Sequence, residues 1–139
     1  MISDGDIAAS LRVASKEADI YMGIGSAPEG VIGATAVKGL NGFFDGRLHF
    51  HSEEAKKRAI EMSGDLINKK ININKLCSSE NSMFIATGVC DGWIPGVEIN
   101  GDKAITSSLL IDVKNKEMTT ITNSYLVSEV NEYISKGVK

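Results

Sequence analysis

Two short segments carry the residue types that could bind a phosphorylated ligand. Asp4, Gly5 and Asp6 stand together near the start of the chain, and a glycine turn from Gly23 to Gly30 precedes a helical pattern. The carboxylates of the first segment can cap a helix, accept hydrogen bonds from sugar hydroxyls or help to ligate a hard cation. Backbone amides at a helix start, together with the helix dipole, favour an anion. The two segments predict either local capping or a site for a polar, anionic ligand.

Glu29 lies in the first turn of the helix predicted after the glycine turn. A carboxylate there interacts favourably with the helix dipole, by about 0.3–1 kcal/mol. The same carboxylate could ligate a divalent cation beside a bound phosphate. The residues alone leave both interpretations open.

A dinucleotide-binding turn is an alternative for this segment. Gly23 and Gly25 fit the opening of the G-x-G-x-x-G fingerprint, and Asp45 follows at the spacing of its acidic residue. The third glycine of that fingerprint would fall at Pro28, and no G-K-[S/T] of a P-loop occurs. The pattern therefore argues against a nucleotide-binding turn.

The histidines and cysteines give weaker signals. His49 and His51 share one face of an extended segment and could bind zinc, but no further ligand is placed to complete a tetrahedral site. Cys77 and Cys90 form no C-x-x-C motif, so inert free thiols are expected. Neither a G-x-S-x-G motif nor a Cys–His nucleophile motif is present. We therefore assign no catalytic nucleophile.

The composition indicates a globular protein and limits the kinds of partner that it can bind. The 139 residues include 42% hydrophobic and 24% charged residues, typical of a globular domain, and the formal net charge is -3. An acidic surface repels the nucleic-acid backbone, so no nucleic-acid partner is expected. The chain shows no apolar run long enough for a membrane span and no signal peptide, which predicts a cytoplasmic protein.

Helical and strand patterns alternate along the chain. Helical periodicity predicts helices over residues 5–17, 27–40, 53–62 and 128–136. Short apolar runs predict strands over residues 19–25, 43–50, 70–73 and 83–87. Two further strands, 104–113 and 117–125, form a predicted hairpin. The pattern predicts one α/β domain over residues 1–139, a three-layer α-β-α sandwich with a mixed, mostly parallel central sheet and an antiparallel hairpin at one edge.

Three segments, taken together, resemble one family. The stretches ISDGDIAAS, DIYMGIGSAPEGVIGATAVKGLNG and IATGVCDGWIPGV are similar, in this order, to the C-terminal region of class II fructose-1,6-bisphosphatases. The resemblance implies a sugar-phosphatase fold related to lithium-sensitive inositol phosphatases. It also implies Mn²⁺- or Mg²⁺-dependent hydrolysis of the 1-phosphate of fructose 1,6-bisphosphate, and some family members also act on sedoheptulose 1,7-bisphosphate.

The resemblance implies roles for five residues. Asp4, Gly5 and Asp6 match the Asp-Gly-Asp with which the family contacts its substrate. Glu29 matches the metal-binding glutamate of the family's Pro-Glu-Gly motif. Ser26 stands where the family usually has a glycine that touches the substrate, so a side chain is added at a tight position.

The resemblance further implies that the family's N-terminal metal-binding domain is absent from this chain, which would supply only part of an active site. The expected partners are a sugar bisphosphate and an N-terminal half or partner chain. A homo-oligomer is also expected, because an uncovered apolar face favours self-association. Two alternatives to a sugar bisphosphatase remain open. One is a non-catalytic module that binds sugar phosphates or anions or serves in assembly, and the other is a half-enzyme that folds only with its partner half.

Overall fold

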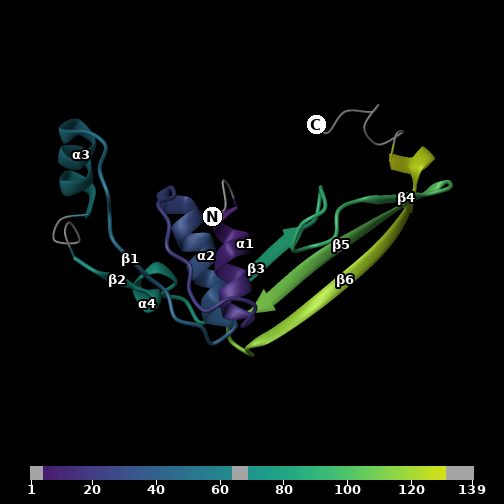
Figure 1. Cartoon of the computed structure of the whole chain (residues 1–139), viewed down its shortest axis with the longest axis horizontal. Helices are drawn as coiled ribbons and strands as arrows, with labels where there is room; N and C mark the ends of the chain where they lie inside the picture. Colours follow the sequence, from purple (N-terminus) through teal and green to yellow (C-terminus); the bar gives the residue numbers. More distant parts are fainter. Residues whose placement is uncertain (1–4, 64–68, 131–139) are drawn as a thin grey trace. The chain divides into compact units, whose positions relative to one another are not determined.

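The computed structural model describes residues 5–63 and 69–130 (Figure 1). The chain divides into two compact units. The first unit contains residues up to Phe84 together with Asp112–Glu117, and the second contains Ile85–Ile111 and the residues from Met118 onward. Among the described helices, none combines the length and the apolar character that crossing a membrane requires.

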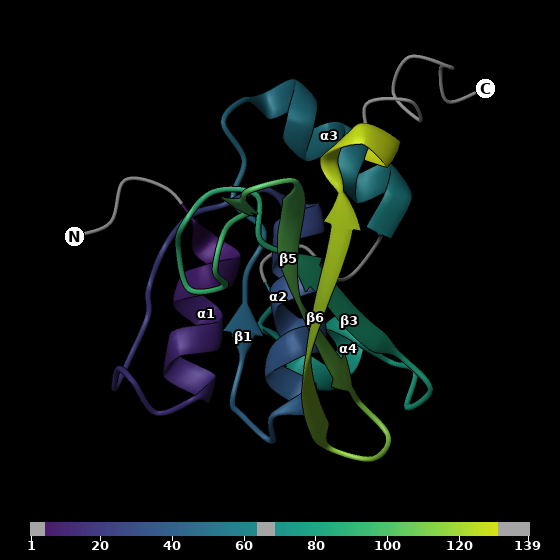
Figure 2. The same cartoon turned by 90° about the vertical axis from the view of Figure 1, so that its right-hand side faces the viewer.

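Two helices packed side by side form the core of the first unit. They are α1 (Asp6–Ala14) and α2 (Ala27–Gly39), and they lie next to each other in both views (Figures 1 and 2). The helix α2 buries Ala34 and Ala36 completely, and Gly33 lies against Ser10 of α1. Small side chains at the contact let the two backbones approach closely, which gives a dense core from few large residues.

The two helices run in the same direction. Gly25, just ahead of α2, lies against the Asp6 carboxylate at the start of α1. At the other end, Gly42 follows α2, and a Cβ atom built on it would lie 3.4 Å from the Cβ of Ala14, the last residue of α1. The starts of both helices therefore meet at one end of the pair, and their dipoles favour negative charge at the same place.

A buried lysine ties α2 to the chain that follows α4 (Ile73–Leu76). The Lys38 side chain is 8% exposed, and its Nζ donates hydrogen bonds to the Cys77 carbonyl at 2.9 Å and to Glu80 Oε1 at 2.8 Å. Lys116 Nζ in turn donates to the Lys38 carbonyl at 3.0 Å. Because a buried ammonium group is costly unless it is paired, these bonds fix the end of α2 against two other segments of the first unit.

Two short strands and a further helix complete the first unit. β1 (Asp45–Gly46) pairs antiparallel with β2 (Ile71–Asn72). A salt bridge of 2.9 Å from Lys70 Nζ to Asp45 Oδ2 supports this pairing. The helix α3 (Glu53–Ser63) lies between them in sequence, and the Ser52 hydroxyl accepts a hydrogen bond from the Ala55 amide at its start.

The other strands form a four-stranded sheet with β5 at its centre. The strands are β3 (Met83–Thr87), β4 (Glu98–Asn100), β5 (Lys103–Asp112) and β6 (Glu117–Leu126). β5 pairs with each of the other three, antiparallel with β4, and forms a long hairpin with β6 (Figure 1). The Asp112 carboxylate closes the hairpin turn by accepting hydrogen bonds from the amides of Lys114 and Asn115. These bonds hold the pKa of Asp112 below its ordinary value, and the bond from the Asn115 backbone amide has the largest effect.

The predicted fold is confirmed in class but not in its sheet arrangement. The α/β composition, the helices after the glycine turn and after Ser52, and the hairpin are all found. The three-layer sandwich and the mostly parallel sheet are not confirmed, because β1 pairs antiparallel with β2 and β4 with β5. The single-domain organisation over residues 1–139 stays a prediction. The last predicted helix begins at residues 127–130, and its remainder lies outside the described residues.

The strand predicted over residues 19–25 is wrong. Residues 20–26 form no regular secondary structure, and Ile20, Met22 and Ile24 are 71%, 84% and 74% exposed. Alternating or continuous apolar residues favour an extended backbone, but a strand also needs a neighbouring backbone to accept and donate hydrogen bonds. The predicted strand over residues 43–50 shortens to β1 for the same reason.

Replacing Lys38 by alanine should lower the free energy of unfolding by about 2 kcal/mol, because the Cys77 carbonyl would lose its buried donor. Lys57→Ala, at an exposed position of α3, is the matched control and should change stability by less than about 0.5 kcal/mol. Chemical denaturation monitored by circular dichroism measures both values. Equal effects of the two substitutions would contradict a stabilising role for Lys38.

Stability should also depend on pH through Glu80. The hydrogen bond from Lys38 holds the pKa of Glu80 below its ordinary value. A lowered carboxyl pKa stabilises the fold above the unfolded-state pKa, and this contribution disappears as the pH falls through the lowered value. Thermal melts should therefore show a difference between the unmodified chain and Glu80→Gln at neutral pH that vanishes in acid. A difference that grows on acidification would contradict this assignment.

Candidate functional site

The candidate site lies where α1 and α2 begin, within the first unit. Gly5 precedes α1 with a φ of 94°, a left-handed conformation that favours glycine. Its carbonyl accepts the first helical hydrogen bond, from the Ala9 amide at 2.9 Å. Because the residue at the N-cap position is a glycine, it offers no side chain to cap this end of α1. Asp4 lies outside the described residues.

Asp6 and the segment before α2 meet through a hydrogen bond from a tyrosine. Tyr21 Oη donates to Asp6 Oδ1 at 2.5 Å. The other carboxylate oxygen, Oδ2, lies against Gly25, where a Cβ atom would overlap it. The hydrogen bond to Asp6 raises the pKa of the Tyr21 phenol, and burial and the negative charge of Asp6 raise it further. The arrangement holds a carboxylate directly beside the turn that leads into α2.

Ser26 and Glu29 lie on the other side of this turn. Ser26 precedes α2 in an extended conformation, and its carbonyl accepts a hydrogen bond from the Gly30 amide at 3.1 Å. Its hydroxyl makes no capping bond to the helix, and both Ser26 and Glu29 are exposed. Glu29 therefore occupies the first turn, as expected, with its carboxylate open to solvent.

The described residues do not hold a metal ion by themselves. Within residues 5–63 and 69–130, no three His, Cys, Asp or Glu side chains gather closely enough to bind one. His49 and His51 stack edge to face with their ring centroids 5.3 Å apart. Among the described residues, they belong to no group of three or more side chains that could complete a zinc site. Cys77 is a buried free thiol and Cys90 an exposed one. Glu29 could contribute one ligand to a metal whose other ligands come from elsewhere.

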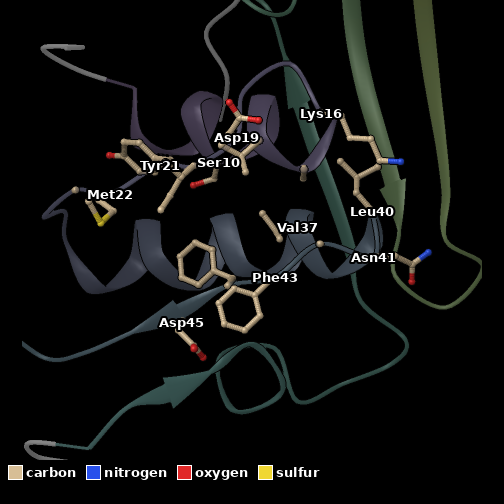
Figure 3. Close-up of a pocket in the computed structure, with 16 residues that line it drawn as sticks. Ser10, Lys16, Asp19, Tyr21, Met22, Val37, Leu40, Asn41, Phe43 and Asp45 are labelled. Atoms are coloured by element: carbon tan, nitrogen blue, oxygen red, sulfur yellow. The ribbon is translucent and has the colours of Figure 1, made fainter.

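A cavity of about 690 Å³ lies beside the hydrogen-bonded pair (Figure 3). Its lining is mainly apolar and includes Tyr21, Met22, Val37 and Phe43, which come from the segment before α2, from α2 and from the segment after it. A sugar bisphosphate carries two negative groups, and the charged side chains in this lining are one cation, Lys16, and two carboxylates, Asp19 and Asp45, so the cavity suits such a ligand poorly. The polar groups at the helix starts are the better match.

The structure brings together some of the predicted site residues. Asp6 meets Gly25 directly, and Gly5 gives α1 the start that places Asp6 there. Tyr21 was missed, because its signal in the sequence is one hydroxyl in an otherwise apolar stretch. The assembled groups can accept hydrogen bonds from hydroxyls and bind an anion, but they include no nucleophile.

Comparison with known proteins identifies relatives. Residues 1–125 match the family described as "Bacterial fructose-1,6-bisphosphatase, glpX-encoded". A Prochlorococcus marinus (strain MIT 9515) protein named D-fructose 1,6-bisphosphatase class 2/sedoheptulose 1,7-bisphosphatase is 38% identical over 126 residues, covering 79% of this chain and 38% of the relative. A protein of the same name from Trichodesmium erythraeum (strain IMS101) is 33% identical over 144 residues, covering 93% of this chain and 42% of the relative. The chain thus spans about two fifths of the length of these curated relatives.

Gly25→Ala should break the Tyr21–Asp6 hydrogen bond, because the added methyl group overlaps Asp6 Oδ2. The overlapping atom ends a flexible side chain, which can swing away, so the free energy of unfolding should fall by no more than about 1 kcal/mol. A spectrophotometric titration should show that the pKa of Tyr21 falls toward its ordinary value.

Gly30→Ala is the matched control, since a methyl group there meets no atom within 4 Å. It should leave the tyrosine titration unchanged and stabilise α2 by about 0.5–1 kcal/mol. An unchanged titration in Gly25→Ala would show that Asp6 does not lie against this turn.

Proposed function

Because the chain belongs to the family of glpX-encoded bacterial fructose-1,6-bisphosphatases, we propose that it provides the substrate-binding part of a sugar bisphosphatase site. The observation that carries this proposal is the meeting of Asp6 with the glycine turn where two parallel helices begin. Both segments lie within the residues that match the family. The substrate class is a ketose bisphosphate, and fructose 1,6-bisphosphate is the first choice.

Different polar groups bind different parts of such a substrate in this proposal. The Asp6 carboxylate accepts hydrogen bonds from sugar hydroxyls, and the exposed Ser26 hydroxyl can donate to the substrate or accept from it. The amides at the start of α2, with the helix dipole, face a phosphate group. A chain with net charge -3 needs such fixed partial charges to bind a bisphosphate. Asp4, whose place in the site rests on the family resemblance, adds a second acceptor in this proposal.

Glu29 is proposed as one ligand of the Mn²⁺ or Mg²⁺ that the family's reaction uses. Its carboxylate is exposed in the first turn of α2, beside the amides assigned to the phosphate. Hard cations prefer carboxylate oxygens, so the donor fits, but a single carboxylate does not make a site. The remaining ligands come, in this proposal, from an N-terminal half or a partner chain, and we assign no catalytic step to the described residues.

In phosphomonoester hydrolysis, water attacks phosphorus and the bond from phosphorus to the sugar oxygen breaks. The share of this chain is to hold the sugar and the phosphate in place, which is a large part of catalysis in phosphoryl transfer. A non-catalytic module that binds sugar phosphates is the second candidate. The observation that favours it is that the described residues contain no cluster able to hold a metal.

Isothermal calorimetry with fructose 1,6-bisphosphate, with and without Mn²⁺, separates the two candidates. A bound phosphate adds oxygen ligands to the Glu29 carboxylate, so a bisphosphatase part should bind the sugar phosphate more tightly with Mn²⁺, by about tenfold, the factor that corresponds to about 1.4 kcal/mol. Glu29→Gln should remove this gain and leave binding without metal unchanged. Glu53→Gln, a substitution in the first turn of α3, is the matched control and should keep the gain. Binding that is indifferent to Mn²⁺ in every variant would favour the non-catalytic module.

A further inference from the structure

We propose that Tyr21 is a positioning residue for sugar binding, because it fixes the Asp6 carboxylate in the orientation that presents its free oxygen to a sugar hydroxyl. This inference rests on the proposed function. It adds a residue outside the groups assigned above to substrate and metal.

Tyr21 is less exposed than its two neighbours, although all three line the cavity. Ile20 and Met22 are 71% and 84% exposed, whereas Tyr21 is half-buried and donates its hydroxyl hydrogen to Asp6. Figure 3 shows Tyr21 and Met22 at the same end of the cavity, with the tyrosine ring beside α1. An extended segment alternates its side chains, so the tyrosine is placed by the same backbone that exposes the two apolar residues.

Two glycines of the turn make room for the two members of this pair. A Cβ atom at Gly23 would overlap the Tyr21 hydroxyl, and a Cβ atom at Gly25 would overlap Asp6 Oδ2. The Gly-x-Gly spacing that suggested a nucleotide-binding turn is thus explained by a hydrogen-bonded tyrosine and carboxylate. Any larger residue at either position would push one partner away from the other.

The chemistry of the pair leaves one carboxylate oxygen for a ligand. An ionised carboxylate accepts hydrogen bonds on both oxygens, and here the phenol occupies Oδ1. Oδ2 lies against Gly25, the residue that precedes Ser26 at the start of α2, and Asp6 is only half-buried. A phenol adds a donor without adding a charge, so the carboxylate keeps its negative charge and its strength as an acceptor.

Tyr21 contributes by holding the Asp6 carboxylate in one orientation. A carboxylate on a short side chain can rotate, and holding it in one orientation before the ligand binds removes part of the entropic cost of binding. Replacing Tyr21 by phenylalanine deletes a single oxygen and retains the ring that lines the cavity. The substitution therefore tests the hydrogen bond rather than the packing.

Two measurements on the whole chain test the inference. Calorimetry with fructose 1,6-bisphosphate should show binding about tenfold weaker in Tyr21→Phe than in the unmodified chain, because the variant has to order the Asp6 carboxylate when the ligand binds. Tyr125→Phe, which removes a half-exposed tyrosine hydroxyl from β6, is the matched control and should bind as the unmodified chain does. Circular dichroism of all variants establishes that they are folded.

A tyrosine titration tests whether the hydrogen-bonded pair exists, independently of sugar binding, and the calorimetry tests whether the pair acts in binding. In the unmodified chain one tyrosine should titrate above the ordinary range, and Asp6→Asn should bring it back, because the charged acceptor is gone. Equal sugar affinity in folded Tyr21→Phe and the unmodified chain overturns the inference, and so does a titration that Asp6→Asn leaves unchanged. If the unmodified chain fails to bind the sugar phosphate, the proposed function fails and the role of Tyr21 in sugar binding fails with it. The titration then still reports whether the pair exists.

Discussion

The packing of α1 against α2 in the same direction is the constraint on which the candidate site depends. Parallel packing brings two helix starts together, and only then do Asp6 and the turn ahead of α2 become neighbours. The close approach needs small residues, and Gly33 of α2 lies against Ser10 of α1. At the far end of α2, Lys38 bonds to Cys77 and Glu80, and Lys116 bonds to the Lys38 carbonyl, which ties the helix to two other segments. The location of the site follows from this packing.

Much of the local structure could be predicted from the sequence because its causes are local. Pro28 suits the first turn of a helix, and Ser52 is a good cap, so both helices begin within a residue of their predicted starts. The hairpin was predicted from two β-branched runs separated by a short polar turn, and Asp112 reinforces that turn by binding its amides. Capping and turn formation involve residues a few positions apart, which a sequence displays directly.

What could not be predicted depends on partners distant in the sequence. The apolar run before the glycine turn has the composition of a strand, yet it pairs with no described strand and exposes Ile20, Met22 and Ile24. The contact of Tyr21 with Asp6 joins residues 15 positions apart and requires the chain to reverse between the two helices. Neither the periodicity nor the composition of the sequence predicts a contact between such distant residues. Family resemblance pointed to Asp6 and not to Tyr21, because the tyrosine acts through another residue.

Under the proposed function, the exposed apolar residues and the single proposed metal ligand, Glu29, have one physical explanation in common. An extended apolar segment without a neighbouring strand is unfavourable in water, and a lone exposed carboxylate binds a divalent cation weakly. The apolar segment would be buried, and the cation would have enough ligands, if another polypeptide packed against this segment and contributed further carboxylates. This chain spans about two fifths of the length of its curated relatives. The end of the helix pair proposed to bind the substrate is nevertheless well formed, since the bond from Tyr21 to Asp6 and the bond from the Ala9 amide to the Gly5 carbonyl lie within one compact unit.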